Sequence, residues 1–206
     1  MATTTTNYGF DIPQSTDLVK DGATAIATLG QDIDTAMNTA LGTKKAGIVL
    51  LNTTSFSGVS SFSLAANTFS STYDNYQIML QATVTVGANL NWRGRTAGTD
   101  NSNSNYDWRA FYNDRTTLAL TTGADNATSA TFNDIGTSRS SYVLEIINPF
   151  ASQPTQVFAK GYVNDGNGYA KYSESQFDTT TSFDSFTFIS SAGTITGSYS
   201  VYGYNK

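Results

Sequence analysis

The chain has 206 residues, a net charge of −5 and no cysteine or histidine. The absence of these two residue types excludes disulfides, thiol nucleophiles, Ser-His-Asp triads and zinc sites built on histidine or thiolate. An acidic chain also lacks the basic face that duplex nucleic acid requires. Ser, Thr and Asn make up about a third of the residues, yet 13% are aromatic, and disordered chains are poor in aromatics. The composition predicts a folded β-protein with a hydroxyl-rich surface.

Residues 1–14 are expected to form an extended polar arm. Tyr8, Phe10 and Ile12 alternate in it, so the arm can lie against a partner or fray. Residues 1–6 have neither the basic nor the apolar region of a secretory signal. The longest aliphatic run, residues 48–51, is far shorter than the ~20 residues of a membrane span. We therefore expect synthesis in a cytoplasm and no membrane insertion.

Residues 15–42 are expected to form an amphipathic helix for oligomerisation or anchoring. Ser15 and Thr16 are candidate N-caps, and Asp17 would lie in the first turn, where the helix dipole favours an anion. Gly42 is a candidate C-cap, followed by two lysines at 44 and 45. Apolar or small residues recur at spacings of three and four, which is typical of a heptad seam. The predicted seam consists of Val19, Gly22, Ile26, Leu29, Ile33, Ala36 and Ala40.

This helix requires a partner for its apolar stripe. It contains Gly22 and Gly30, and each glycine costs about 1 kcal/mol relative to alanine. The stripe can pack on the chain's own β-domain or against other copies of the helix. We favour a short homo-oligomeric bundle, because Gly22, Ala36 and Ala40 would allow helices to approach closely around a symmetry axis.

From Ala46 onward the pattern changes to the period of two that is typical of strands. About ten short strands separated by Gly, Asn and Pro turns predict a β-sandwich or jelly-roll-like domain over residues 43–206. In one long strand, the residues expected on a single face are Tyr76, Ile78, Leu80, Ala82, Val84 and Val86. In another, Val157, Ala159, Gly161 and Val163 share one face, while Phe158, Lys160 and Tyr162 share the other.

Two segments suggest metal or acid–base chemistry but fit poorly. Residues 100–107 are rich in Asp and Asn, but Asn105 and Phe111 occupy the positions where a calcium loop has Gly and Glu. Glu145 lies in an apolar strand, where burial would raise the pKa of its carboxyl. We interpret it as an outward strand position or a partner of an arginine such as Arg139. We therefore expect no metal, no cofactor and no catalytic residue.

A candidate ligand-binding face contains both tryptophans and three of the five arginines. Tryptophan rings stack on sugars and cations, and arginine binds carboxylates or polar sugars. If neighbouring strands carry them, these residues can form one face; alternatively, the tryptophans fill the core and the arginines pair with Asp. The candidates are Trp92, Arg93, Arg95, Trp108 and Arg109.

Three stretches resemble the minor tail and fibre-like virion proteins of bacteriophages. They are residues 7–33, beginning Asn-Tyr-Gly-Phe-Asp-Ile-Pro, residues 72–76, Thr-Tyr-Asp-Asn-Tyr, and residues 193–206, ending Val-Tyr-Gly-Tyr-Asn-Lys. Together they cover a little under a quarter of the chain. The resemblance implies a trimer on a virion, with an N-terminal segment that docks on the particle and an outward C-terminal β-domain.

The expected function is that of a non-enzymatic virion structural protein, a homotrimeric tail or fibre-like appendage with a host-surface glycan-binding face. Its partners would be other copies of itself, other virion proteins through the arm and helix, and a host glycan. The alternative is a capsid decoration protein or head fibre of the same build. A carbohydrate-active enzyme is less consistent with the chain, because two convergent carboxylates are needed and only Glu145 and Glu174 are glutamates.

Overall fold

The structure is a computed structural model of the chain. It describes residues 3–6, 8–12, 18–42, 47–113, 118–166 and 168–205. The chain divides into two compact units, Met1–Gly47 and Ile48–Lys206, and each unit is described by itself. In the described part of the chain, no helix combines the length and the apolar character needed to cross a bilayer.

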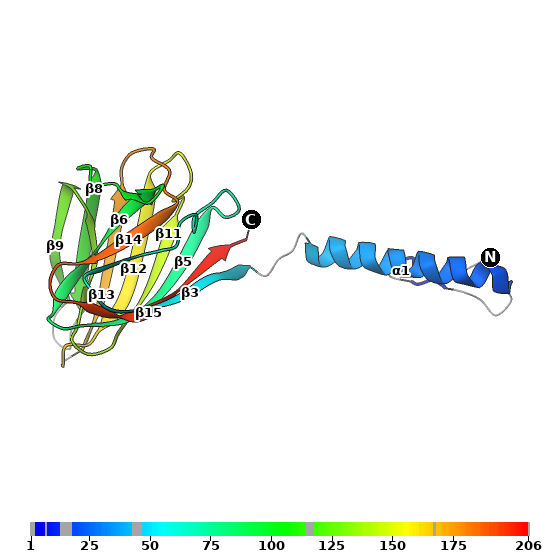
Figure 1. Cartoon of the computed structure of the whole chain (residues 1–206), viewed down its shortest axis with the longest axis horizontal. Helices are drawn as coiled ribbons and strands as arrows, with labels where there is room; N and C mark the ends of the chain where they lie inside the picture. Colours follow the sequence, from blue (N-terminus) through cyan, green and yellow to red (C-terminus); the bar gives the residue numbers. More distant parts are fainter. Residues whose placement is uncertain are drawn as a thin grey trace. The chain divides into compact units, whose positions relative to one another are not determined.

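The N-terminal unit contains two short strands and one helix (Figure 1). Strands β1 (Thr3–Thr4) and β2 (Asp11–Ile12) pair antiparallel, so the predicted arm folds into a short hairpin. Thr5 closes this hairpin, because its N–H donates to the Phe10 carbonyl and its hydroxyl accepts the Phe10 N–H, both at 2.9 Å. The rings of Tyr8 and Phe10 stack with centroids 5.6 Å apart.

Helix α1 spans Val19–Gly42. Asp21 lies in its first turn, where the positive end of the helix dipole stabilises a carboxylate. Gly42 is the last helical residue, not the cap beyond the helix that the sequence suggested. The candidate N-caps Ser15 and Thr16, the predicted first-turn Asp17, and the two lysines at 44 and 45 lie outside the described residues.

The predicted seam of α1 is exposed to solvent. Ile26 is 65% exposed and Ile33 is 40% exposed. Ala40 is also exposed, while Gly22, Leu29 and Ala36 are half-exposed; the side chain of Val19 is outside the described set. Apolar side chains in water lose the burial free energy that stabilises a helix of this kind. The helix therefore presents an apolar stripe that a partner can cover.

The C-terminal unit is a β-sandwich of two antiparallel sheets (Figure 1). The larger sheet has eight strands, in the order β3 (Ile48–Val59), β15 (Ile195–Tyr204), β5 (Asn75–Val84), β11 (Ser140–Ile147), β12 (Thr155–Val163), β13 (Tyr169–Phe177), β8 (Tyr106–Asn113) and β9 (Leu118–Ala127). The smaller sheet has five strands, in the order β10 (Ala130–Ile135), β6 (Ala88–Thr96), β14 (Ser185–Ser190) and β4 (Ser61–Ser63), with β7 (Thr99–Asp100) paired to β6. The sequence predicted the sandwich but about ten strands in place of these thirteen.

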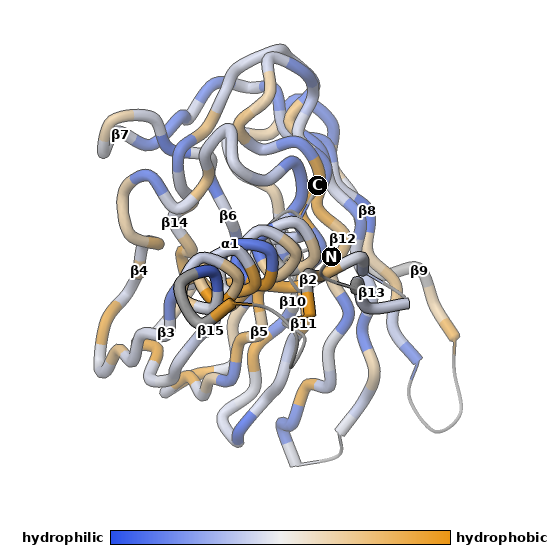
Figure 2. Tube along the Cα trace, turned by 90° about the vertical axis from the view of Figure 1, so that its right-hand side faces the viewer, coloured by the Kyte–Doolittle hydropathy of each residue, from blue (hydrophilic) through white to orange (hydrophobic). Residues whose placement is uncertain are grey.

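Alternation of side chains sets the two faces of each strand, as the repeated change between hydrophilic and hydrophobic residues along the trace in Figure 2 shows. On β5, the predicted inward residues from Tyr76 to Val84 are buried. Val86 was expected to continue this face, but β5 ends at Val84 and Val86 is exposed. On β12, Val157, Ala159 and Val163 of the predicted shared face are buried, while Gly161 of the same set is half-buried.

Aromatic rings fill the space between the sheets. Trp92 stacks on Phe186 with ring centroids 4.5 Å apart and meets the edge of Tyr106 at 5.2 Å. Gly94 is required beside them, because a Cβ at this position would lie 2.4 Å from the ring of Phe183. The buried hydroxyl of Tyr106 accepts the Gly94 N–H at 3.0 Å and donates to the Asn101 carbonyl at 2.8 Å. The core is thus packed by rings whose polar atoms have partners.

Candidate functional site

The five residues of the predicted ligand face do not lie together. Trp92, on β6, is 0% exposed and donates its indole N–H to Ser175 at 3.0 Å inside the core. Its ring cannot stack on a ligand, so the assignment of Trp92 to a binding face is wrong. Trp108, on β8, also points inward and packs against the core as a half-buried side chain.

The three arginines are divided between the two sheets, with Arg93 and Arg95 on β6 and Arg109 on β8, and all three have partners within the chain. Arg93, on β6, donates to the Thr128 carbonyl at 3.0 Å. Arg109, on β8 of the larger sheet, pairs with Asp125 at 2.8 Å and also donates to backbone carbonyls of β8 and β9. Of the five predicted residues, Arg109 and the neighbouring Trp108 both line a hollow on the outer side of the larger sheet.

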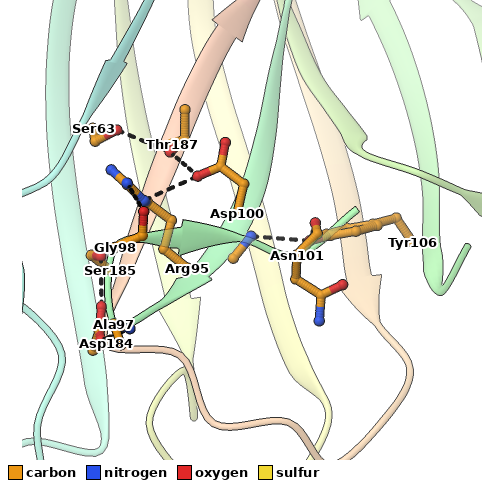
Figure 3. Close-up of polar contacts among 11 residues, drawn as sticks. Ser63, Arg95, Ala97, Gly98, Asp100, Asn101, Tyr106, Asp184, Ser185 and Thr187 are labelled. Atoms are coloured by element: carbon orange, nitrogen blue, oxygen red, sulfur yellow. Dashed lines mark hydrogen bonds and ion pairs between the residues drawn. The ribbon is translucent and has the colours of Figure 1, made fainter. Parts of the chain in front are cut away.

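Arg95 belongs to a polar network at the β6–β7 hairpin (Figure 3). Its guanidinium pairs with Asp100 at 3.0 Å and donates to the Gly98 carbonyl. Asp100 also accepts the hydroxyl of Thr187 at 2.7 Å, which ties the hairpin to β14. Asp100 therefore serves as a structural anchor in the segment that resembles a calcium loop. Among the described residues, no group of three or more acidic side chains is placed to hold a metal ion.

The larger sheet carries a second candidate surface. We call the side of this sheet that points away from the five-stranded sheet the outer face. Two rows of directly paired residues cross its centre. One row contains Met79, Val143, Lys160, Tyr172 and Phe111, on β5, β11, β12, β13 and β8. The adjacent row contains Gln77, Glu145, Phe158, Glu174 and Arg109 on the same strands.

Three hollows lie side by side on the outer face, and together we call them the outer groove. The first, of about 560 Å³, has small residues such as Ser141 and Ser200 beside the larger Tyr202 and Tyr172. The second, of about 260 Å³, shares Lys160 and Tyr172 with the first. The third, of about 380 Å³, shares Phe158 and Glu174 with the second. The groove therefore crosses the strands from β15 to β9.

Aromatic rings line the middle of the outer groove. Phe158 is 45% exposed, and Tyr172 and Phe111 are exposed to a similar extent. The rings of Phe111 and Tyr172 stack with centroids 5.2 Å apart and an interplanar angle of 14°, which fixes them as one platform. Exposed rings held by a sheet offer apolar area at little cost in conformational entropy.

Glu145 lies on the outer face, in agreement with the predicted alternative of an outward strand position. Its carboxylate accepts the Gln77 amide and the Tyr204 hydroxyl, each at 2.6 Å. Burial, with the neighbouring Glu145 as a further cause, raises the pKa of Tyr204 to about 12, so this hydroxyl keeps its proton and remains a donor. By contrast, the side chains of Lys160, Glu174 and Gln156 form no hydrogen bond or ion pair within the described part of the chain. Their polar groups are available to a ligand.

The sequence contains a pattern that indicates the outer groove, but the cluster of Trp and Arg residues was chosen as the candidate site in its place. On β12, the face opposite Val157 and Ala159 carries Phe158, Lys160 and Tyr162. On β11, the apolar run includes Val143, which belongs to the outer groove. A strand with large apolar residues on both faces is covered on both faces or binds something.

No family profile, curated protein or solved structure matches this chain. The assignment of function therefore depends on the chain's own residues and geometry.

Proposed function

We propose that the protein is a non-enzymatic structural protein of a bacteriophage virion, a homotrimeric tail or fibre-like appendage. The hairpin and helix α1 would join the copies and attach them to other virion proteins. The β-sandwich would face outward and bind the host surface. The three stretches that resemble minor tail and fibre-like proteins support the virion setting.

The exposed seam of α1 is the observation that carries this proposal. Ile26 and Ile33 place two large aliphatic side chains in water on one stripe of a helix of 24 residues. Burial of each such side chain contributes about 1.5–3 kcal/mol, so assembly of several copies along this stripe is favourable. The proposal of three copies, as opposed to another number, follows from the resemblance to fibre-like virion proteins. Branched residues alternating with Leu29 along the heptads also suit a two-stranded coil, so the mass of the assembly must be measured.

Light scattering on the purified full-length chain tests the assembly. The chain has a mass of 22.0 kDa, so a trimer gives about 66 kDa and a dimer about 44 kDa. Ile26→Asp is expected to lower the mass to that of a monomer, because it places a charge in the seam. Thr24→Asp adds the same charge outside the seam and serves as the control. A wild-type monomer at micromolar concentration would contradict self-assembly through α1.

Removal of residues 1–42 tests attachment. The remaining chain contains the whole sandwich unit, so we expect it to stay folded by circular dichroism and to lose attachment to virions that lack the protein. Attachment that survives this deletion would place the anchor in the β-sandwich. A full-length protein that attaches to virions but binds no cell would indicate capsid decoration, the alternative that the sequence left open.

A further inference from the structure

We infer that the outer groove binds an uncharged polysaccharide chain. This inference rests on the proposed function, because it names the ligand through which the appendage would hold its host. It assigns the stacking role to Phe158, Tyr172 and Phe111. It assigns hydrogen bonding with sugar hydroxyls to Lys160, Glu174 and Gln156.

The dimensions of the groove favour a polymer over a single small molecule. Its three hollows share lining residues and cross the sheet from β15 to β9. Seven adjacent strands at a spacing of about 4.8 Å span roughly 29 Å. Small-molecule sites typically measure about 300–1,000 Å³; the first and third hollows, of about 560 and 380 Å³, fall in this range, and the second, of about 260 Å³, is slightly smaller. A chain of several sugar units, one or two per hollow, matches this arrangement.

The aromatic residues provide the surfaces on which sugar rings stack. One face of a pyranose ring presents C–H groups, which pack against the negative face of an aromatic ring. Phe158 lies in both the second and the third hollow, and Tyr172 lies in both the first and the second. Each ring therefore stands at the boundary between two hollows, where a bound chain would pass from one to the next.

The polar residues beside these rings complement the hydroxyls of a sugar. Lys160 supplies donors, Glu174 supplies acceptors, and Gln156 supplies both. Phe158 pairs directly with Glu174, and Tyr172 pairs directly with Lys160. Each ring thus has an available polar group next to it, as a ligand with an apolar face and a polar rim requires.

The charge of the groove favours a neutral ligand over an anionic one. Two cations and four carboxylates line the three hollows, and they are Lys160, Arg109, Glu145, Glu174, Asp107 and Asp125. The net charge of the lining is therefore negative, as is that of the whole chain. A polyanion would meet repulsion that a neutral polysaccharide does not.

Native affinity electrophoresis of the full-length protein tests this inference. Gels contain dextran, mannan or galactomannan as neutral probes, and hyaluronate or polygalacturonate as anionic probes. We expect retardation by at least one neutral probe and by neither anionic one. Phe158→Ala and Tyr172→Ala are each expected to weaken retardation about fivefold, the effect of one lost ring contact. Avidity within a trimer increases the measured effect.

Phe150→Ala is the matched control. Phe150 is 39% exposed, close to the value for Phe158, and lies in the loop between β11 and β12, outside the three hollows. Its removal is expected to leave retardation unchanged. Circular dichroism checks that each variant is folded, and Glu174→Gln provides a variant that keeps the volume of the side chain. Full retardation of folded Phe158→Ala and Tyr172→Ala variants would overturn the site.

Two further outcomes separate this inference from the proposed function. Retardation by the anionic probes alone, or by no probe, overturns the polysaccharide class, while attachment to virions and to cells still supports the appendage. A fall in mass to a monomer for Phe158→Ala identifies the groove as a contact between copies, which also overturns the inference. Failure of the full-length protein to attach to virions rejects the proposed function, whatever the gels show.

Discussion

Trp92 and Ser175 connect the two sheets of the sandwich through a buried hydrogen bond. The indole N–H of Trp92, on β6, donates to the hydroxyl of Ser175, on β13, at 3.0 Å. The same hydroxyl lies 3.4 Å from the Val157 carbonyl, to which it donates. The Ser175 hydroxyl therefore accepts the hydrogen bond that the buried indole N–H requires, and its own proton is bonded to a carbonyl.

Ser175→Ala is expected to lower the free energy of unfolding by about 1–3 kcal/mol, because it leaves the indole N–H buried without an acceptor. Urea denaturation followed by tryptophan fluorescence measures this change. Ser55→Ala, at an exposed position of β3, is the control and should change stability by less than about 0.5 kcal/mol. Equal effects of the two substitutions would show that the bond adds no stability.

A buried ion pair provides the second prediction. Lys171 points inward from β13, and its ammonium lies 2.5 Å from Asp134 of β10. Only 4% of the Lys171 side chain is exposed, against 27% for Asp134. The Tyr169 hydroxyl donates to the second carboxylate oxygen at 2.9 Å.

Asp134→Asn leaves the buried ammonium without a counter-ion. The loss of one partner in a fully buried pair costs about 3–5 kcal/mol, and the partial exposure of Asp134 reduces this to about 2–4 kcal/mol. Lys171→Met should cost less, because the remaining carboxylate has water and Tyr169 as partners. Denaturation in urea ranks the two variants, and the reverse order would contradict this account.

Alkaline pH is expected to unfold the sandwich. Burial raises the pKa of Tyr106 to about 12, and it also raises the pKa values of Tyr76, Tyr142 and Tyr169 above the ordinary tyrosine value of 10.0. In the unfolded chain these groups ionise near pH 10, while in the folded chain they keep their protons. The stability that they contribute is therefore present below pH 10 and is lost as the pH rises from 10 to about 12. Tyrosinate absorbance and circular dichroism should change together in this range; ionisation of all tyrosines near pH 10 with the fold intact would refute the prediction.

The two glycines inside α1 form a matched pair for testing the seam. Around both Gly22 and Gly30, a Cβ would meet no atom within 4 Å in the single chain. Gly30→Ala, outside the seam, should stabilise the assembled helix by up to about 1 kcal/mol per copy. Gly22→Ala should stabilise it less or destabilise it, because a methyl group at a seam position separates neighbouring helices. Thermal unfolding of the assembly compares the two, and an equal gain at both positions would place Gly22 outside the contact.

The sequence predicted the fold better than it predicted the candidate site. Period-two alternation identified the inward face of β5, and the period of three and four identified α1, because both signals are local. Trp92 was ambiguous because its burial depends on residues far away in the sequence, such as Phe186 of β14, which stacks on it. Local sequence patterns carry no information about such contacts. The outer groove was missed for the same reason, since Phe111, Phe158 and Tyr172 become neighbours only through the order of β8, β13 and β12 in the sheet.

The pairing of β3 with β15 has a consequence for how the chain folds. The first and last strands of the sandwich lie side by side, cyan and red in Figure 1, and Thr53 contacts Ser200 across a separation of 147 residues. Closing so long a loop costs about 4 kcal/mol of entropy, and among the residues that the structure describes β3 pairs with no other strand of the larger sheet. During synthesis β3 therefore pairs with β15 only after residues 195–204 have left the ribosome, whereas the helix at residues 19–42 is synthesised before either strand. If α1 joins the copies, as proposed above, helices of neighbouring nascent chains would meet before any sandwich has closed.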